Sequence, residues 1–339
     1  MNQFDKILGA FLGAAVGDAM GAPTEMRTTK QIIEYFGGPV REFKEPPYDT
    51  FARGRKPGQV TDDFSLAYFL AKSIIRHNGK LGFDVVKESL LEWGNTDEYF
   101  IPFAGPTTRA AIERLKGTQV KNKDEVVNFN ATATNGSAMK IFPVGLLNSG
   151  NIDKAIEDAA KVCIPTHNNH LSISGACAIA AAVSKAMDDD ADVYSIVQAG
   201  LHGARKGEEI GREISHIVAG PSVVKRMELA VEIGLKSSSI DEAMQDIGDY
   251  VGSGLHISEA VPAVFGIFVA CEGKTMDCIY AGVNIGNDTD TVATMVGALA
   301  GAYNGCASLP KEYLSLINER NNFCLDILAQ EFERVVRRG

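Results

Sequence analysis

The sequence predicts an all-α protein folded as one compact domain that spans residues 1–339. Apolar residues recur mostly at the three- and four-residue spacing of helices, while the apolar–polar alternation of strands is sparse. Glycine is frequent inside the helical stretches, and 34 glycines make up about 10% of the 339 residues, against roughly 7% in average proteins. Because a glycine inside a helix costs ~1 kcal/mol relative to alanine, the sequence indicates helix backbones that pack closely.

Helical spacing marks a series of segments between breaks at glycine or proline. Two of them, GAFLGAAVGDAMGA and VGALAGAYNGCA, consist mainly of small residues and are the best candidates for close packing. The predicted helices run from Ile7 to Met20, Asp62 to Arg76, Phe83 to Trp93, Thr107 to Leu115, Asp153 to Val162, Leu171 to Met187, Glu208 to Val218, Ser222 to Ile233, Ile240 to Ile247, Ser258 to Cys271, Thr291 to Tyr303 and Phe323 to Val336.

No linker, internal repeat or low-complexity tract divides the chain, which favours a single domain. The longest stretch rich in proline, glycine and charge covers residues 37–60 and ends directly at an acidic motif. Long loops in compact domains are more often functional than idle. We therefore expect this loop to border a site.

Composition excludes several classes of function. With 33 basic and 43 acidic residues the net charge is −10, which disfavours a broad basic surface for duplex nucleic acid. Apolar runs are broken well before the ~20 residues of a membrane span. Asp5, Lys6 and Asp18 interrupt the apolar N-terminal stretch, so it is interpreted as a helix and not as a signal peptide. The six cysteines form no CxxC pair, which predicts reduced thiols in a cytoplasmic protein and disfavours a zinc site.

Two acidic motifs each end a loop and open an apolar helix. The first is GQVTDDFS at residues 58–65, and the second is NIGNDTDT at residues 284–291. Aspartate and threonine at such places can be ordinary helix caps, but a cap needs one oxygen and each motif supplies two carboxylates. Four carboxylates brought together repel one another unless cations neutralise them, and hard oxygen ligands suit Mg²⁺, Mn²⁺ or Ca²⁺ better than zinc. The predicted metal ligands are Thr61, Asp62, Asp63, Asp288, Asp290 and Thr291.

Two more acids lie near the end of the first predicted helix. Asp18 interrupts an apolar stripe, and a buried carboxylate needs a partner, so a hydrogen-bonded structural role is the first interpretation. Glu25 follows a Gly-Ala-Pro break and is expected on a loop. It becomes a candidate catalytic residue if that loop folds over the carboxylates.

Two polar segments are candidates for ligand contacts. Backbone N–H groups of the loop Asn135-Gly136-Ser137 can bind a phosphate or a sugar hydroxyl, although Asn-Gly is also a common turn. His167 precedes another predicted helix, where capping and surface roles are the more frequent alternatives.

In chain order, GAFLGAAVGDAMGAPTE, TDDFS, NGSAMKIFPVGLL, a Thr-His pair before a helix, and NIGNDTDTVATMVGALAGAYNG resemble the ADP-ribosylglycohydrolase family from Gly9 to Gly305. The resemblance implies an all-α orthogonal helical bundle with a dinuclear metal centre of two Mg²⁺ (or Mn²⁺) ions in a central cleft. It places the two TDD and DTDT motifs on opposite sides of the metals and Glu25 beside them. It also implies that Asn135, Gly136, Ser137 and His167 hold the ADP-ribose part of the substrate.

Three positions depart from the pattern of the family. Phe64 stands where a threonine is usual after TDD, Asn287 replaces the second of two glycines before DTDT, and Lys140 replaces an arginine after Ala-Met. The last change loses a planar donor fork. The predicted metal ligands are untouched, so the departures bear on the substrate more than on the chemistry.

The resulting hypothesis is hydrolysis of a glycosidic bond at the anomeric carbon of a ribose, through a transition state of oxocarbenium character. Asp62 and Asp290 are expected to act through the metals and Glu25 as an acid or base. The expected partner is an ADP-ribosyl or ribosyl substrate, and the acidic surface without a heptad seam favours a monomer.

Three alternatives remain at this point. One is a hydrolase of simpler, nucleoside-like N-ribosides, and another is a non-catalytic ADP-ribose binder, which would not require two metals. The third is an isoprenoid synthase, whose Asp and Asn-Asp motifs need further acids where Leu66 and Met295 stand. The sequence therefore disfavours the third.

Overall fold

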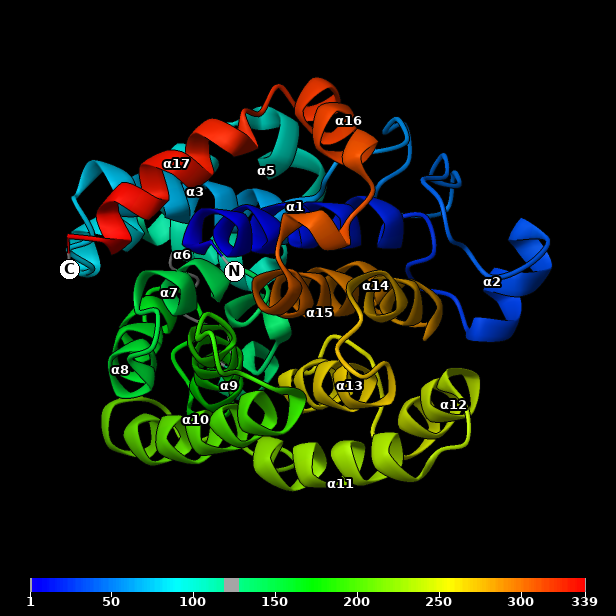
Figure 1. Ribbon diagram of the computed structural model, residues 1–339. Coiled ribbons are helices and arrows are strands. Elements are labelled where there is room, and N and C mark those ends of the chain that lie inside the picture. The colour runs from blue at the N-terminus through cyan, green and yellow to red at the C-terminus, as the bar shows by residue number, and fades with distance from the viewer. Residues whose placement is uncertain (1, 119–127, 339) are drawn as a thin grey trace.

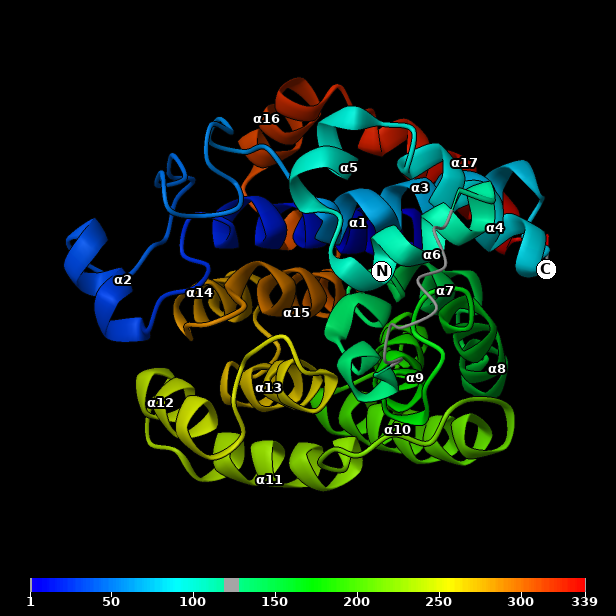
Figure 2. The same ribbon diagram turned by 180° about the vertical axis from the view of Figure 1, so that it is seen from behind.

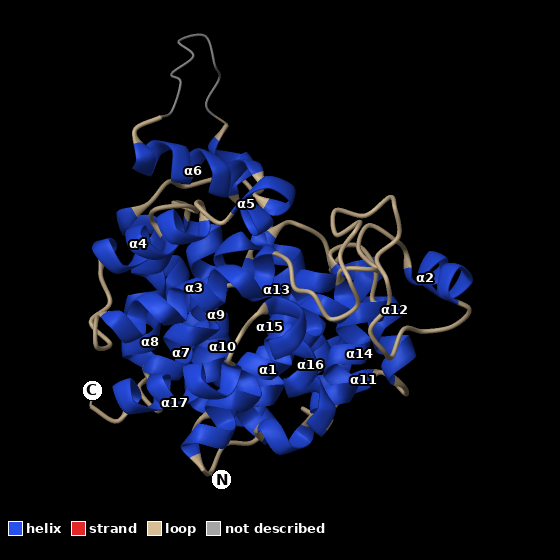
Figure 3. Cartoon of the chain, turned by 90° about the horizontal axis from the view of Figure 1, so that it is seen from above, coloured by secondary structure: helices blue, strands red, loops and turns tan. Residues whose placement is uncertain are grey.

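A computed structural model describes residues 2–118 and 128–338. Within these residues it contains α-helices, three short 3₁₀ helices and isolated β-bridges, but no β-strand (Figure 3). The predicted all-α class is confirmed. Among the helices of the described part, none is long and apolar enough to cross a membrane.

The α-helices follow one another along the chain, and the longest stretches between them lie between α2 and α3 and between α6 and α7. Their bounds are α1 Gln3–Gly21, α2 Thr29–Phe36, α3 Asp62–Arg76, α4 Phe83–Trp93, α5 Asp97–Phe103, α6 Pro106–Lys116, α7 Phe142–Leu147, α8 Ile152–Cys163, α9 His170–Ala186, α10 Val193–Ile214, α11 Val223–Lys236, α12 Ile240–Tyr250, α13 Ile257–Ala270, α14 Thr275–Asn284, α15 Thr289–Asn304, α16 Lys311–Asn321 and α17 Leu325–Val336; the 3₁₀ helices are η1 Phe129–Thr132, η2 Asn135–Ser137 and η3 Cys306–Ser308.

The helices are arranged in layers around α1 and α15, which lie side by side through the middle of the molecule (Figures 1 and 2). Helices α3, α16 and α17 cover one side of this pair, and α9 and α13 lie on the other side. Helices α10 and α11 form an outer layer against α9 and α13. The loop at 37–60 and the short helix α2 lie at one edge (Figure 1).

Glycines allow α1 and α15 to touch backbone to backbone. A Cβ atom on Gly13 would lie 2.2 Å from the carbonyl oxygen of Gly297, and one on Gly301 would lie 2.1 Å from the carbonyl oxygen of Gly9. Neither position can hold a larger residue without separating the helices, because the obstructing atoms are backbone. The close packing expected from the small-residue runs is present.

The same antiparallel contact positions the candidate site. A Cβ atom on Gly21, the last residue of α1, would lie 2.5 Å from the Cα atom of Asp290 in the first turn of α15. The end of α1 is therefore held against the start of α15. This brings Asp18 and the loop that follows α1 to the second acidic motif.

The predicted helices at Asp62–Arg76 and Phe83–Trp93 have the predicted bounds. The helix expected from Glu208 to Val218 is wrong in extent, because α10 begins at Val193 after the capping box of Asp192 and Ser195. It ends at Ile214, where the chain turns so that the N–H of His216 donates to the carbonyl of Asn168. The sequence interpretation missed α2, α5, α7, α14 and α16, which are short helices of 6 to 11 residues.

Candidate metal centre and substrate loop

The two acidic motifs occupy the N-termini of two helices. Asp62 and Asp63 are the first residues of α3, and Thr61 is its N-cap. Asp288 is the N-cap residue of α15, and Asp290 lies in its first turn. The N-terminal end of a helix carries partial positive charge, which favours carboxylates there. The residues that could cap these helices are therefore the same residues that could bind a metal ion.

Asp18 takes over much of the capping of α3. Its fully buried carboxylate accepts hydrogen bonds from the backbone N–H groups of Thr61 (2.9 Å) and Phe64 (2.8 Å) and from the Thr61 hydroxyl (2.8 Å). This is the hydrogen-bonded structural role expected from the sequence. Since Asp18 satisfies these donors, the carboxylates of Asp62 and Asp63 are left for other partners.

The loop that carries Glu25 does fold over the carboxylates. The N–H of Met26 donates to the carbonyl of Asn287, and the N–H of Asn287 donates to the carbonyl of Arg27, both at 2.8 Å. Carboxylate oxygens of Glu25, Asp288 and Asp290 consequently lie within 4.8 Å of one another.

Asp63 shows that the acidic cluster lacks partners. The side chain is 3% exposed, and its Oδ1 atom has no hydrogen-bond partner within the described residues. The Thr61 hydroxyl lies 3.3 Å from the other oxygen, Oδ2. A buried oxygen without a donor is costly, so this atom calls for a partner that the described side chains do not supply.

Crowding perturbs the acids strongly. Burial, followed by the charges of Asp288 and Asp62, raises the pKa of Glu25 to about 8. Burial, followed by the charges of Asp18 and Asp288, raises the pKa of Asp62 to about 8 as well. The pKa values of Asp63 and Asp290 also lie well above the ordinary range, for the same two reasons.

These residues fit a divalent cation. The donors are carboxylate and hydroxyl oxygens, which hard cations prefer, and one of them is a buried orphan. A cation would replace mutual repulsion among the acids with attraction. Thr291 belongs to the same group, because its backbone N–H donates to Asp290 Oδ1 at 3.1 Å.

The predicted substrate loop lies beside this cluster. Asn135–Ser137 forms η2, and the Asn135 side chain donates to Asp288 Oδ2 at 2.7 Å. A Cβ atom on Gly136 would lie 2.9 Å from Nε2 of His167, so the imidazole packs directly on the loop. Ser137 differs from its neighbours, since its fully buried hydroxyl donates to the carbonyl of Ser172 and is used inside the fold.

The structure explains two of the three departures. Phe64 is fully buried and packs against Phe142 and Phe323, with ring centroids 6.5 and 5.7 Å away, so its ring belongs to the core and not to the acidic cluster. Asn287 adopts φ +64°, a left-handed conformation that asparagine tolerates better than most residues. The backbone pairing with the Glu25 loop is thereby kept without glycine.

Sequence reasoning singled out Lys140 only as a departure and gave Thr134 and Thr166 no role. Lys140 is 2% exposed, and its ammonium donates to the carbonyl of Gly136 at 2.7 Å and to Thr166 Oγ1 at 3.3 Å. A buried lysine needs such partners. The burial of Lys140 could have been inferred from the sequence, because Lys140 lies between the substrate loop and an apolar segment.

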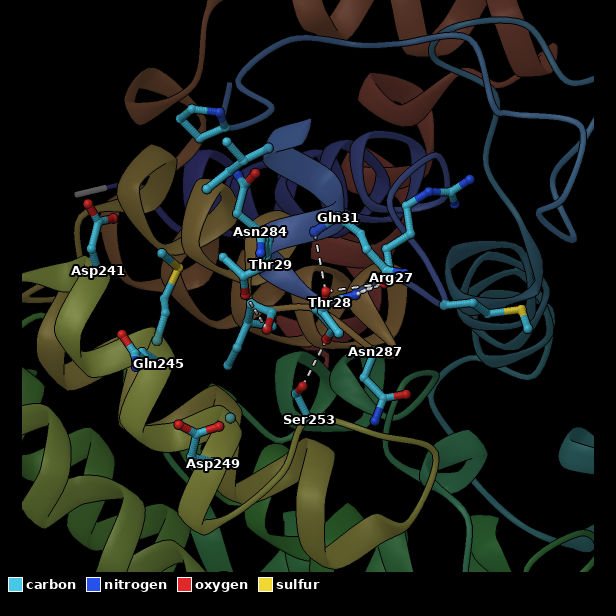
Figure 4. A pocket seen from close by; sticks show the side chains of 18 of the residues that line it. Arg27, Thr28, Thr29, Gln31, Asp241, Gln245, Asp249, Ser253, Asn284 and Asn287 are labelled. Carbon is cyan, nitrogen blue, oxygen red and sulfur yellow. Dashed lines mark hydrogen bonds between the residues drawn. The ribbon is translucent and has the colours of Figure 1, made fainter. Parts of the chain in front are cut away.

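A cavity of about 1120 Å³ opens next to the paired loops (Figure 4). It lies between α2, α12 and the segment before Asp288, and its lining includes Arg27, Asp249 and Asn287. Glu25 and Asp288 do not line it, so the cavity is a neighbour of the acidic cluster and not its interior. Of the loop 37–60, Pro39 lines the cavity, and the charge of Arg55 partly offsets the rise that burial causes in the pKa of Asp18, so the loop borders this region as expected.

The fold and the site together are those of an all-α scaffold, centred on a glycine-packed helix pair, whose helix termini carry clustered acids with oxygen donors that suit a divalent cation. Over residues 1–338 the chain matches the ADP-ribosylglycohydrolase family, and it belongs to that family. Members of this family are glycoside hydrolases, so the chain is an enzyme of the glycosidase type.

Several curated relatives match over nearly their whole length. An uncharacterized Escherichia coli protein, YegU, is 30% identical over 323 residues, which cover 93% of each chain. The ADP-ribosyl-[dinitrogen reductase] glycohydrolase of Rhodospirillum rubrum is 26% identical over 93% of this chain and 90% of its own. Human ADP-ribosylhydrolase ARH3 is 24% identical over 100% and 95%.

A solved structure described as an ADP-ribosylglycohydrolase-related protein complex superposes with a TM-score of 0.68. It is 26% identical in sequence, and the match covers 98% of this chain and 99% of that one. The two chains therefore share one fold from end to end.

Proposed function

We propose that this chain, as one domain of residues 1–339, hydrolyses the glycosidic bond at the anomeric carbon of the ribose in ADP-ribosylated substrates, with the help of two Mg²⁺ or Mn²⁺ ions. The observation that carries the proposal is the orphan oxygen of Asp63 inside a group of carboxylates, among which the pKa values of Glu25, Asp62, Asp63 and Asp290 are raised. A site built only to bind ADP-ribose would not need this concentration of acids.

The ions would be held from two sides. Thr61, Asp62 and Asp63 approach from α3, and Asp288, Asp290 and Thr291 approach from α15. When bound, the ions supply Lewis acidity and a water of lowered pKa. The fixed contact between the end of α1 and the start of α15 holds one of these two sides in place.

Other residues act on the substrate directly in this proposal. Glu25, with a raised pKa and its carboxylate beside Asp288 and Asp290, takes or gives the proton that the reaction requires. Asn135 keeps the Asp288 carboxylate oriented through its 2.7 Å hydrogen bond. His167 and the backbone of residues 135–137 bind the ADP-ribose part.

Calorimetric titration of the metal-loaded protein with ADP-ribose tests the proposal. We expect metal-dependent binding that disappears in Asp62→Ala plus Asp290→Ala. The matched control is Asp84→Ala plus Asp326→Ala, which removes two exposed first-turn acids from α4 and α17 and should bind normally.

Turnover of ADP-ribosylated arginine and serine substrates then decides the reaction. Binding of ADP-ribose without turnover of either substrate would favour a binder over a hydrolase. If the folded, metal-loaded wild type did not bind ADP-ribose, the ADP-ribosyl assignment would fail, and turnover of a plain N-riboside would identify the simpler hydrolase instead.

A further inference from the structure

Four side chains beneath the substrate loop form one continuous hydrogen-bonded chain. Lys140 Nζ lies 3.3 Å from Thr166 Oγ1, which lies 2.8 Å from His167 Nδ1, and His167 Nε2 lies 2.9 Å from Thr134 Oγ1. Lys140 and His167 are only 2% and 1% exposed. This series of hydrogen bonds therefore runs from the buried ammonium of Lys140 to the half-buried Thr134, which directly precedes Asn135.

The direction of the first two bonds follows from the chemistry of the groups. An ammonium has hydrogens to donate and no lone pair to accept with, so Thr166 Oγ1 accepts from Lys140. The hydroxyl of Thr166 still has its own hydrogen to donate. Within the described residues His167 Nδ1 is the one other polar atom bonded to this hydroxyl, so Nδ1 accepts that hydrogen.

The next two steps fix the remaining hydrogens. Burial, and after it the charge of Lys140, lowers the pKa of His167 well below its ordinary value, so the ring is neutral. A neutral imidazole carries one N–H, and with Nδ1 accepting, that hydrogen is on Nε2. Nε2–H then donates to Thr134 Oγ1.

Thr134 is the open end of this series of hydrogen bonds. Its oxygen accepts from His167, while its own hydroxyl hydrogen has no acceptor among the residues that the structure describes. The next residue, Asn135, contacts Asp288 of the acidic cluster. The hydroxyl of Thr134 is therefore free to donate to a ligand that lies between the loop and the cluster.

We propose that Lys140 is a positioning residue: through Thr166 it holds His167 as the Nε2–H tautomer, and it thereby makes the Thr134 hydroxyl a hydrogen-bond donor to an oxygen of the bound ligand. The ligand chemistry is an acceptor oxygen of a ribosyl phosphate, either on the sugar or on the phosphate. A ligand that offers a donor at this point, such as an amine, is disfavoured. The identity of the ligand rests on the proposed function, whereas the tautomer does not.

The tautomer is measured directly in the ligand-free protein. Long-range ¹H–¹⁵N correlation spectra of uniformly ¹⁵N-labelled protein distinguish a protonated ring nitrogen from an unprotonated one, and a His167→Gln variant assigns the His167 signals. We expect Nε2–H in the wild type and in Lys140→Arg, which keeps a buried cationic donor. In Lys140→Met we expect the Nδ1–H form to appear, because the Thr166 hydroxyl is then free to turn away.

Thr166→Val gives the same test if Lys140→Met does not fold. It leaves the cation in place but removes the link, so it should also release the tautomer. Lysine acting only as a structural cation would change thermal stability without changing which nitrogen is protonated. A wild type with Nδ1–H, or a Lys140→Met or Thr166→Val variant that keeps pure Nε2–H, would overturn the proposal.

The donor is tested by titrating metal-loaded wild type, Thr134→Val and Thr134→Ser with ADP-ribose, ribose 5-phosphate and ribose. Thr134→Val should bind ADP-ribose roughly 5- to 10-fold more weakly, the usual worth of one hydrogen bond, and Thr134→Ser should bind normally. A loss seen also with plain ribose identifies a sugar oxygen, and a loss confined to the phosphorylated ligands identifies the phosphate. Unchanged affinity of Thr134→Val would refute the donor role, whereas a wild type that binds none of these ligands would count against the proposed function and leave the tautomer result standing.

Discussion

The candidate site has two sides, an acidic wall and a substrate wall, which are built on opposite principles. On the acidic wall, made by the N-termini of α3 and α15, carboxylates outnumber donors, and Asp63 keeps a buried oxygen without a partner. On the substrate wall, both ring nitrogens of His167 and the ammonium of Lys140 form hydrogen bonds with hydroxyl or carbonyl oxygens of the protein itself.

The difference shows which part of the site has its polar groups satisfied by the protein alone. The substrate wall is held in place by its own hydrogen bonds, which is the basis of preorganisation. The acidic wall repels itself until cations are added. Substitutions on the acidic wall should therefore cost function while relieving the metal-free fold, and substitutions on the substrate wall should cost stability.

The largest effect is expected from Asp290→Ala. Asp290 lies at the contact of α1 with α15 and shares the carboxylate group of Glu25 and Asp288. Its removal should lower turnover of an ADP-ribosylated substrate by roughly 10³-fold or more, as expected for loss of a main electrostatic element. Normal metal binding and normal turnover in this variant would show that the acidic wall is not the catalytic centre.

Glu25→Ala should be less severe. Glu25 belongs to a loop and not to a helix terminus, and a general acid or base contributes ~10²–10⁴ in rate. We expect a measurable remnant of activity, with metal affinity close to that of the wild type by calorimetry. Turnover equal to that of the wild type would remove Glu25 from the mechanism.

The metal-free protein should lose stability as the pH rises. Folding raises the pKa values of Asp62 and Glu25 to about 8, from ordinary values of 3.8 and 4.5. The folded state then binds more protons than the unfolded state between about pH 4 and pH 8, so the free energy of unfolding falls across this window. Above pH 8 the carboxylates are ionised and repel one another, so bound cations should stabilise the folded protein most at high pH.

Thermal unfolding with and without a chelator measures this effect. The melting temperature of the chelated protein should fall from pH 5 to pH 8, and the gain on adding Mg²⁺ or Mn²⁺ should be larger at pH 8 than at pH 5. A metal-dependent gain that is equal at both pH values would mean that the cations bind away from these carboxylates.

Much of the acidic wall could be predicted from the sequence, because its residues lie in two short motifs at the starts of strongly patterned helices. The bounds of α3 were predicted correctly for the same reason. The glycine runs predicted close packing, although they did not identify α1 and α15 as partners. That pairing depends on which of several small-residue helices meet, which is a property of the whole fold.

The substrate wall was less accessible to sequence reasoning. Asn135, Gly136 and His167 do lie together, but Thr134 and Thr166 gain their roles from the direction of hydrogen bonds between segments far apart in the chain. Asp18 is similar: its burial was predictable, whereas its capping of a helix 43 residues further along was not. Such roles depend on tertiary contacts that leave no local pattern.

The smallest predicted effects separate the two walls most sharply. In metal-free protein at pH 7, Asp63→Asn should raise the melting temperature by a few °C, because the amide cannot ionise in a site that disfavours the charge. In a domain of this size ~1 kcal/mol is worth roughly 1–2 °C. Ser137→Ala on the substrate wall should lower the melting temperature, since the buried hydroxyl loses its bond to Ser172, at a cost of ~1 kcal/mol.

The response to metal separates the two variants further. Adding metal should raise the melting temperature of Ser137→Ala as much as that of the wild type and leave that of Asp63→Asn almost unchanged. If both variants were destabilised in the metal-free state and responded equally to metal, the contrast between a wall completed by cations and a wall completed by the chain would not hold.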